Sequence, residues 1–281
     1  MTDVEREIQK KEQTKKINFQ KLFDSINVNK IPILISISFL IVFLYVDIFI
    51  NIYWMNYDGY YYLNQGNAIL SGNGQDIKAW NAPIGGPVIY SITNTFVNDG
   101  YLTLKLFSVF GGAGIVFLSY FITKNIFNPK IALLTQLFVV VNTSLHWITI
   151  QAGNELLALF LIIFSFYFIT KKQLNKKDLV IIGIILGTAF SIRFQTSLVF
   201  FSFIIFLLIR NRNFKINITH IGIVAIIFLV VASPIFIYNY STYGKILDSD
   251  PTGQAILAWK YQTIEWREEA AVSYTHLRAH E

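Results

Sequence analysis

Three charged residues in this sequence, Asp58, Glu155 and Arg193, each lie next to an apolar run. Asp58 follows the first such run and precedes a segment with helical spacing. A carboxylate placed there can accept a proton from an incoming hydroxyl group. Aspartate is also a preferred N-cap residue, so Asp58 equally suits the start of a helix. The two roles are compatible, because a cap would hold the carboxylate in place.

For Glu155 and Arg193, too, both a functional role and a purely structural role are open. Acidic residues within the membrane are costly and often functional, but a glutamate at a helix start is also favoured by the helix dipole. The guanidinium group of Arg193 matches the geometry of a phosphate. Its alternative role is to reach from an apolar segment to the membrane interface.

Metal ligation has weak support in the sequence. Asp76 and Asp99 share a loop with Asp58 but lack a ligand-like spacing. Asp248 and Asp250 form a D-x-D pair, which can bind a divalent ion but more often marks a turn. We therefore predict no metal ligand and no definite cofactor, and a divalent metal stays open.

Long apolar runs must position these residues. The chain is 54% hydrophobic and 14% charged, whereas a soluble domain carries about a quarter charged residues. Crossing a bilayer takes about 20 apolar residues, and backbone groups in lipid must be satisfied within a helix. We predict an all-α, polytopic membrane helical bundle with about seven transmembrane helices, over Ile31–Tyr53, Leu102–Thr123, Ile131–Ile150, Asn154–Thr170, Leu179–Ile192, Phe194–Ile209 and Ile221–Tyr240.

The basic residues predict the orientation of this bundle. Most of the lysines and arginines lie in residues 1–30 and in alternate connections between the apolar runs. Cytoplasmic loops are rich in such residues, so residues 1–30 are predicted to be cytoplasmic and loop 54–100 extracytoplasmic. Arg193 then lies at the outer tip of a hairpin. This bias also explains the net charge of +6 without a nucleic-acid partner.

Loop 54–100 is predicted to carry two short helices on the membrane surface. The first follows Asp58 and ends near Gly72 and Gly74. The second begins at Pro87, a residue favoured in the first helical turn, and runs to Phe96. Aromatic residues of this loop, Tyr61 among them, suit the water–lipid boundary.

The last residues have an unusual composition. The sequence VSYTHLRAHE (Val272–Glu281) resembles a translated sequencing adaptor. We therefore expect residues 272–281 to be non-native and the natural protein to continue beyond about Ala271. Residues 248–271 would begin an outer loop or a further element, and His276 and His280 are not counted as ligands.

Several motifs, in order, resemble a known group of enzymes. DGYYYLNQGNAILSGNG (Asp58–Gly74) resembles the first outer loop of lipid-dependent membrane glycosyltransferases of the GT-C fold, which include the protein mannosyltransferase and aminoarabinose transferase-like families. NAPIGGPVIYSI (Asn81–Ile92) resembles their Pro-Gly-x-Pro segment, although Ile84 and Gly85 depart from the usual spacing. Further segments that resemble the same enzymes are Leu104–Thr135, His146–Phe160, Gly183–Phe200 and Ala232–Leu247.

The resemblance covers residues 31–247 and implies a function. It implies a glycosyltransferase that moves a sugar from a polyprenyl-phosphate donor to an acceptor hydroxyl of a protein, lipid or glycan. Asp58 matches the catalytic base, Glu155 a second acidic position and Arg193 a basic position. We hypothesise an inverting transfer on the outer face of the cell membrane, with Lys78 and Tyr61 as further donor-binding residues. The alternatives are a transporter or flippase for a lipid-linked substrate, or a non-catalytic membrane subunit.

Overall fold

The structure is a computed structural model that describes residues 30–50, 54–55, 57–72, 83–171, 173–210, 214–244 and 246. These residues form ten α-helices and one π-helical segment, so the predicted all-α class is confirmed. The elements are α2 (Lys30–Tyr45), η1 (Val46–Ile50), α3 (Tyr57–Leu70), α4 (Gly85–Val97), α5 (Gly100–Ile126), α6 (Pro129–Val140), α7 (Thr143–Thr149), α8 (Glu155–Ile169), α9 (Lys176–Ile192), α10 (Thr196–Arg210) and α11 (Phe214–Tyr243).

The apolar helices indicate an integral membrane protein. Within the described residues, three stretches are long and apolar enough to cross a membrane: Lys30–Ile50, Gly100–Ile126 and Asn217–Ser241. Each of the seven predicted apolar segments contains helix, but α8, α9 and α10 have only 15, 17 and 15 residues and are not among these three stretches. The total of seven transmembrane helices therefore stays a prediction.

The third predicted segment, Ile131–Ile150, forms two helices and not one. Helices α6 and α7 meet at an angle of 56° and would make a fourth span only as one bent unit. Asn142 explains the break, because its side chain accepts a hydrogen bond from the backbone of Leu145 at 2.8 Å and so caps a new helix.

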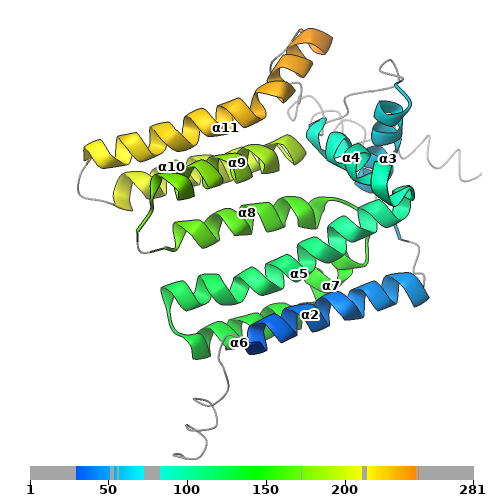
Figure 1. Ribbon diagram of the computed structural model, residues 1–281, viewed down its shortest axis with the longest axis horizontal. Coiled ribbons are helices and arrows are strands. Elements are labelled where there is room, and N and C mark those ends of the chain that lie inside the picture. The colour runs from blue at the N-terminus through cyan, green and yellow to red at the C-terminus, as the bar shows by residue number, and fades with distance from the viewer. Residues whose placement is uncertain are drawn as a thin grey trace, which may run out of the picture.

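The long helices lie side by side, with α11 at one side, then α9 and α10, α8, α5, and α2 with α6 at the other (Figure 1). Glycines let some of them approach closely, as is typical of membrane helices. A Cβ atom on Gly111 of α5 would lie 2.6 Å from the backbone of Leu156 in α8. A Cβ atom on Gly112 would lie 2.8 Å from Oγ1 of Thr149, and one on Gly114 would lie 2.4 Å from the ring of Phe160.

Helices α3 and α4 pack together at one end of this row (Figure 1). Both short helices were predicted, with two differences at their starts. Asp58 lies inside the first turn of α3 and not before it, where the helix dipole favours a carboxylate just as a cap would. Helix α4 begins at Gly85, two residues ahead of Pro87, because a proline is tolerated throughout the first turn.

The end of α3 agrees with the prediction. Gly72 has a φ of +73°, a left-handed conformation that suits glycine at a helix end. Gly74 lies outside the described residues. The location of α3 and α4 on a membrane surface stays a prediction.

Candidate active site

Arg193 joins the two acidic residues singled out in the sequence. One of its guanidinium nitrogens, Nη2, lies 2.8 Å from Oδ2 of Asp58 and 2.7 Å from Oε1 of Glu155. Asp58 is 135 residues and Glu155 is 38 residues away along the chain. The three side chains are partly exposed, by 49% for Asp58, 28% for Arg193 and 23% for Glu155. The fold therefore gathers two carboxylates and a cation at a place that a solute can reach.

Helix ends place all three groups. Asp58 lies in the first turn of α3, and Glu155 is the first residue of α8. Each carboxylate thus benefits from the partial positive charge of a helix N-terminus. Arg193 is the C-cap of α9 and has an extended backbone conformation, which ends that helix and leads into α10. Its predicted place between these two helices is confirmed, whereas its location on the outer face is not tested.

The start of α4 packs against residues that adjoin this cluster. A Cβ on Gly85 would lie 2.2 Å from the carbonyl oxygen of Ser191, and one on Gly86 would lie 2.6 Å from Nδ2 of Asn154. Only glycines allow the backbone of α4 to come this close. The glycine pair of the NAPIGGPV stretch therefore brings α4 against the residues next to Arg193 and Glu155.

Tyr62 is a buried tyrosine beside the charged cluster. Its side chain is 1% exposed and hydrogen-bonds with Asn154. Burial raises the pKa of Tyr62, and the carboxylates of Asp58 and Glu155 raise it further against the opposing effect of Arg193. The phenol therefore stays neutral. No feature of the segment Asp58–Gly74 distinguishes Tyr62 from its other tyrosines.

Arg193 stays a cation in this setting. Burial alone would lower its pKa, but the carboxylates of Glu155 and Asp58 outweigh that effect and raise it. Among the described residues, three buried polar atoms in or beside the cluster have no hydrogen-bond partner: Nε of Arg193, Oδ1 of Asn154 and Oγ1 of Thr196. Buried polar groups are normally satisfied, so these atoms suit a polar ligand.

The remaining predicted residues lie elsewhere or stay untested. Tyr61 packs edge-on against Tyr62, with ring centroids 5.5 Å apart, so it adjoins the site. Lys78 lies outside the described residues, as do Asp76, Asp248 and Asp250. Asp99 caps α5 by accepting a hydrogen bond from the backbone of Leu102 at 2.9 Å. Across the described ranges no cluster of three or more His, Cys, Asp or Glu residues could hold a metal ion.

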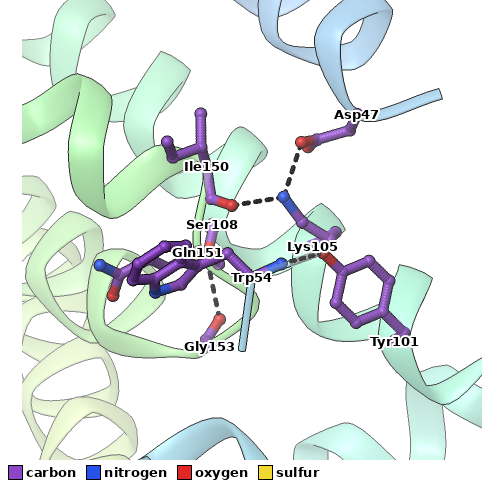
Figure 2. A network of polar contacts seen from close by, with 8 residues as sticks. All are labelled: Asp47, Trp54, Tyr101, Lys105, Ser108, Ile150, Gln151 and Gly153. Carbon is purple, nitrogen blue, oxygen red and sulfur yellow. Dashed lines mark hydrogen bonds and ion pairs between the residues drawn. The ribbon is translucent and has the colours of Figure 1, made fainter. Parts of the chain in front are cut away.

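Sequence reasoning missed one buried ion pair near the site. Nζ of Lys105 lies 2.8 Å from Oδ1 of Asp47, and these side chains are only 2% and 4% exposed (Figure 2). Neither Lys105 nor Asp47 is among the residues singled out in the sequence. A usable signal was present, because each is an ionisable residue inside an apolar run and such residues normally pair.

The fold and the site together define a class of protein. It is a helical membrane protein with a partly exposed cluster of two carboxylates and a guanidinium group at one end of its bundle. Such a cluster is suited to proton transfer and to anion binding. The sequence model of a protein family described as dolichyl-phosphate-mannose-protein mannosyltransferase matches residues 81–238, more than half of the 281 residues, and the chain belongs to this family. Membership implies a glycosyltransferase that uses a lipid-linked sugar.

The matched range contains Glu155 and Arg193 but begins after Asp58. The link between Asp58 and the family region is therefore geometric and consists of its ion pair with Arg193. Comparisons with the curated proteins and with the solved structures gave no match.

Proposed function

We propose that this protein transfers a sugar from a polyprenyl-phosphate donor to an acceptor hydroxyl on the outer face of the membrane, with inversion and with Asp58 as the base. The observation that carries the proposal is the meeting of Asp58, Glu155 and Arg193 from three separate elements. Family membership supports the lipid-linked donor. Nucleotide sugars are cytosolic, so transfer on the outer face needs a donor that membrane lipids can deliver.

The step has a simple balance of atoms. The acceptor oxygen attacks the anomeric carbon of the sugar, and its proton passes to the Asp58 carboxylate. The bond between the anomeric carbon and the phosphate oxygen breaks, and the electron pair leaves with the polyprenyl phosphate. Attack opposite the leaving group inverts the configuration. Half-exposure of Asp58 supports this role, because the base must reach an incoming acceptor.

Arg193 supplies the positive charge at which a phosphate leaves. It stays protonated, and its Nε has no partner in the structure. A fixed cation near developing negative charge is the usual electrostatic aid to such a reaction. Glu155, held by the same guanidinium group, orients the sugar or the acceptor. Lys78 is a second cation proposed for the phosphate, and Tyr61 adjoins the site as a further donor-binding residue.

A reconstitution experiment separates transfer from transport. The full-length protein in liposomes receives a polyprenyl-phosphate sugar labelled in the sugar. We expect the label to move to an acceptor, with release of polyprenyl phosphate and the opposite anomeric configuration in the product. Movement of the intact labelled lipid between leaflets without cleavage would contradict the proposal and indicate a transporter. Retained configuration would contradict the inverting step alone.

A further inference from the structure

One face of α5 holds together the two chain segments that lead to the acidic residues. Tyr101, Lys105 and Ser108 are spaced by four and three residues, so they share this face. The backbone N–H of Trp54 donates to the Tyr101 hydroxyl at 3.0 Å, and Lys105 donates to the carbonyl of Ile150 (Figure 2). Ser108 donates to the carbonyl of Gln151 at 2.6 Å.

The two held segments also bond to each other. The backbone N–H of Ala152 donates to the carbonyl of Trp54 at 2.9 Å, and Met55 and Ala152 form a parallel β-bridge. Asp58 lies three residues after Met55, and Glu155 lies three residues after Ala152. The bridge between Met55 and Ala152 therefore aligns the two segments that lead to Asp58 and Glu155.

Lys105 connects α5 to two other parts of the chain. Its ammonium group bonds to the carbonyl of Ile150 and to the carboxylate of Asp47 in η1. It therefore ties α5 to the end of the first helical segment and to the segment before Glu155. A buried cation is tolerated in an apolar bundle only when it is paired, and Asp47 supplies the pairing charge.

We propose that Lys105, with Asp47 as its counterion, is a positioning residue that keeps segments 54–55 and 150–153 in register so that Asp58 and Glu155 both reach Arg193. This inference rests on the proposed function. Lys105 acts on segment 150–153 through the carbonyl of Ile150. It acts on segment 54–55 through Tyr101, whose ring centroid lies 5.5 Å from the ammonium group and whose hydroxyl accepts from Trp54. A purely structural pair would instead stabilise the bundle without setting the register between Met55 and Ala152.

The double variant D47L–K105M tests the inference. It removes both charges at similar side-chain volume, a change that folded proteins often tolerate. We expect normal insertion and a melting temperature close to that of the parent. The kcat for sugar transfer should fall at least tenfold, because Asp58 and Glu155 are misplaced around the reacting groups. The KM for the donor should change less than threefold, because Arg193, which binds the donor phosphate, keeps its place at the end of α9. K124M, at the other end of α5, is the matched control and should keep the parent kcat.

A disulfide provides the rescue. The chain has no cysteine, so M55C–A152C creates a single thiol pair at the β-bridge. In the D47L–K105M background, oxidation of this pair should restore most of the lost kcat, and reduction should remove it again. A kcat within twofold of the parent for D47L–K105M, or a disulfide that forms without restoring kcat, would overturn the inference.

The rate of disulfide formation separates this inference from the proposed function. It reports the proximity of positions 55 and 152 whether or not sugar is transferred. We expect it to fall several-fold when D47L–K105M is added, and equal rates would overturn the positioning role. If the parent protein transfers no sugar, the proposed function fails while this measurement still decides the register.

Discussion

Arg193 contacts both carboxylates through one guanidinium nitrogen, Nη2, while its buried Nε has no hydrogen-bond partner among the described residues. The sequence could predict the three charged residues because each interrupts an otherwise apolar neighbourhood. Their distances could not be predicted, since they depend on how α3, α8 and α9 end in space. Tyr62 and Asn154 were missed for a related reason. Their importance comes from burial against the cluster, and neither residue type is unusual in a helix start or a loop.

Gly153 gives the most direct test of the position of Glu155. A Cβ at residue 153 would lie 2.2 Å from Oε2 of Glu155, so G153A must push that carboxylate away. The displaced atom is the end of a flexible side chain, and we therefore expect little loss of stability. Transfer should fall about 10- to 100-fold, because small misplacements of reacting groups are costly. Steady-state rates and thermal melting of the purified variant measure both effects.

Two results for G153A would contradict this expectation. If G153A transfers sugar at the parent rate with an unchanged donor KM, the position of Glu155 is unimportant for the reaction. A large loss of thermal stability would instead show that the backbone, and not the carboxylate, had moved.

At the scale of elements, α4 is held on the end of α9 by contact between backbones. The Cβ that Gly85 lacks would lie 2.2 Å from the carbonyl oxygen of Ser191. Sequence pattern could predict α4 as a helix with its start near Pro87. It could not predict this contact, because nothing in residues 83–87 specifies a partner more than 100 residues away.

G85A should therefore separate α4 from α9. We expect a loss of about 1–3 kcal/mol in the free energy of unfolding, as is usual when a packed site is overfilled, and reduced transfer. G222A in α11 is the matched control, because a Cβ there meets nothing within 4 Å. It should be neutral or slightly stabilising, since alanine favours helix. Equal thermal stability of the two variants would contradict the packing account.

The connection between α8 and α9 has an ion pair of its own. Nζ of Lys171 lies 2.7 Å from Oδ1 of Asp178, and Asp178 also completes a capping box with Asn175. Burial by itself would raise the pKa of Asp178, but the hydrogen bonds from Lys171 and from the backbone of Asn175 lower it overall. A lowered pKa in the folded state means that the charged form stabilises the fold.

D178N should show the pH dependence that follows. At pH 7 we expect a loss of about 1 kcal/mol, kept small because Lys171 is one-third exposed. The stabilisation is complete above the unfolded pKa of about 4 and is lost as the pH falls through the lower folded value. The difference in melting temperature between parent and D178N should therefore shrink below about pH 4. A difference that stays constant down to pH 3 would contradict the assigned charge effect.

The whole molecule has two chemically different ends. Helices α3 and α4 lie at the end where α5 and α8 begin and α9 ends, together with the charged cluster (Figure 1). The basic residues Lys124, Lys130, Lys171, Lys176 and Lys177 lie at the turns of the opposite end. Apolar runs and charge bias could predict this division. They could not predict the break between α6 and α7, nor the pairing of Asp47 with Lys105, because both depend on local capping and on packing between distant segments.

Reporter fusions test the orientation at this scale. A reporter that is active only outside the cytoplasm should be inactive when fused after Phe127, at the turn between α5 and α6. It should be active when fused after Tyr243, at the end of α11. The lysine-rich end would then be cytoplasmic, as expected from charge bias. Activity after Phe127, or none after Tyr243, would reverse the proposed face of the reaction.

The central claim is that Asp58 takes the acceptor proton. The most direct measurement is the rate of sugar transfer from a polyprenyl-phosphate donor by D58N, compared with D99N in the same loop. Asparagine still caps a helix, so D99N should keep the parent rate. We expect D58N to insert and melt as the parent does and to lose about 10²- to 10⁴-fold in rate. Transfer by D58N within a few-fold of the parent would contradict the account.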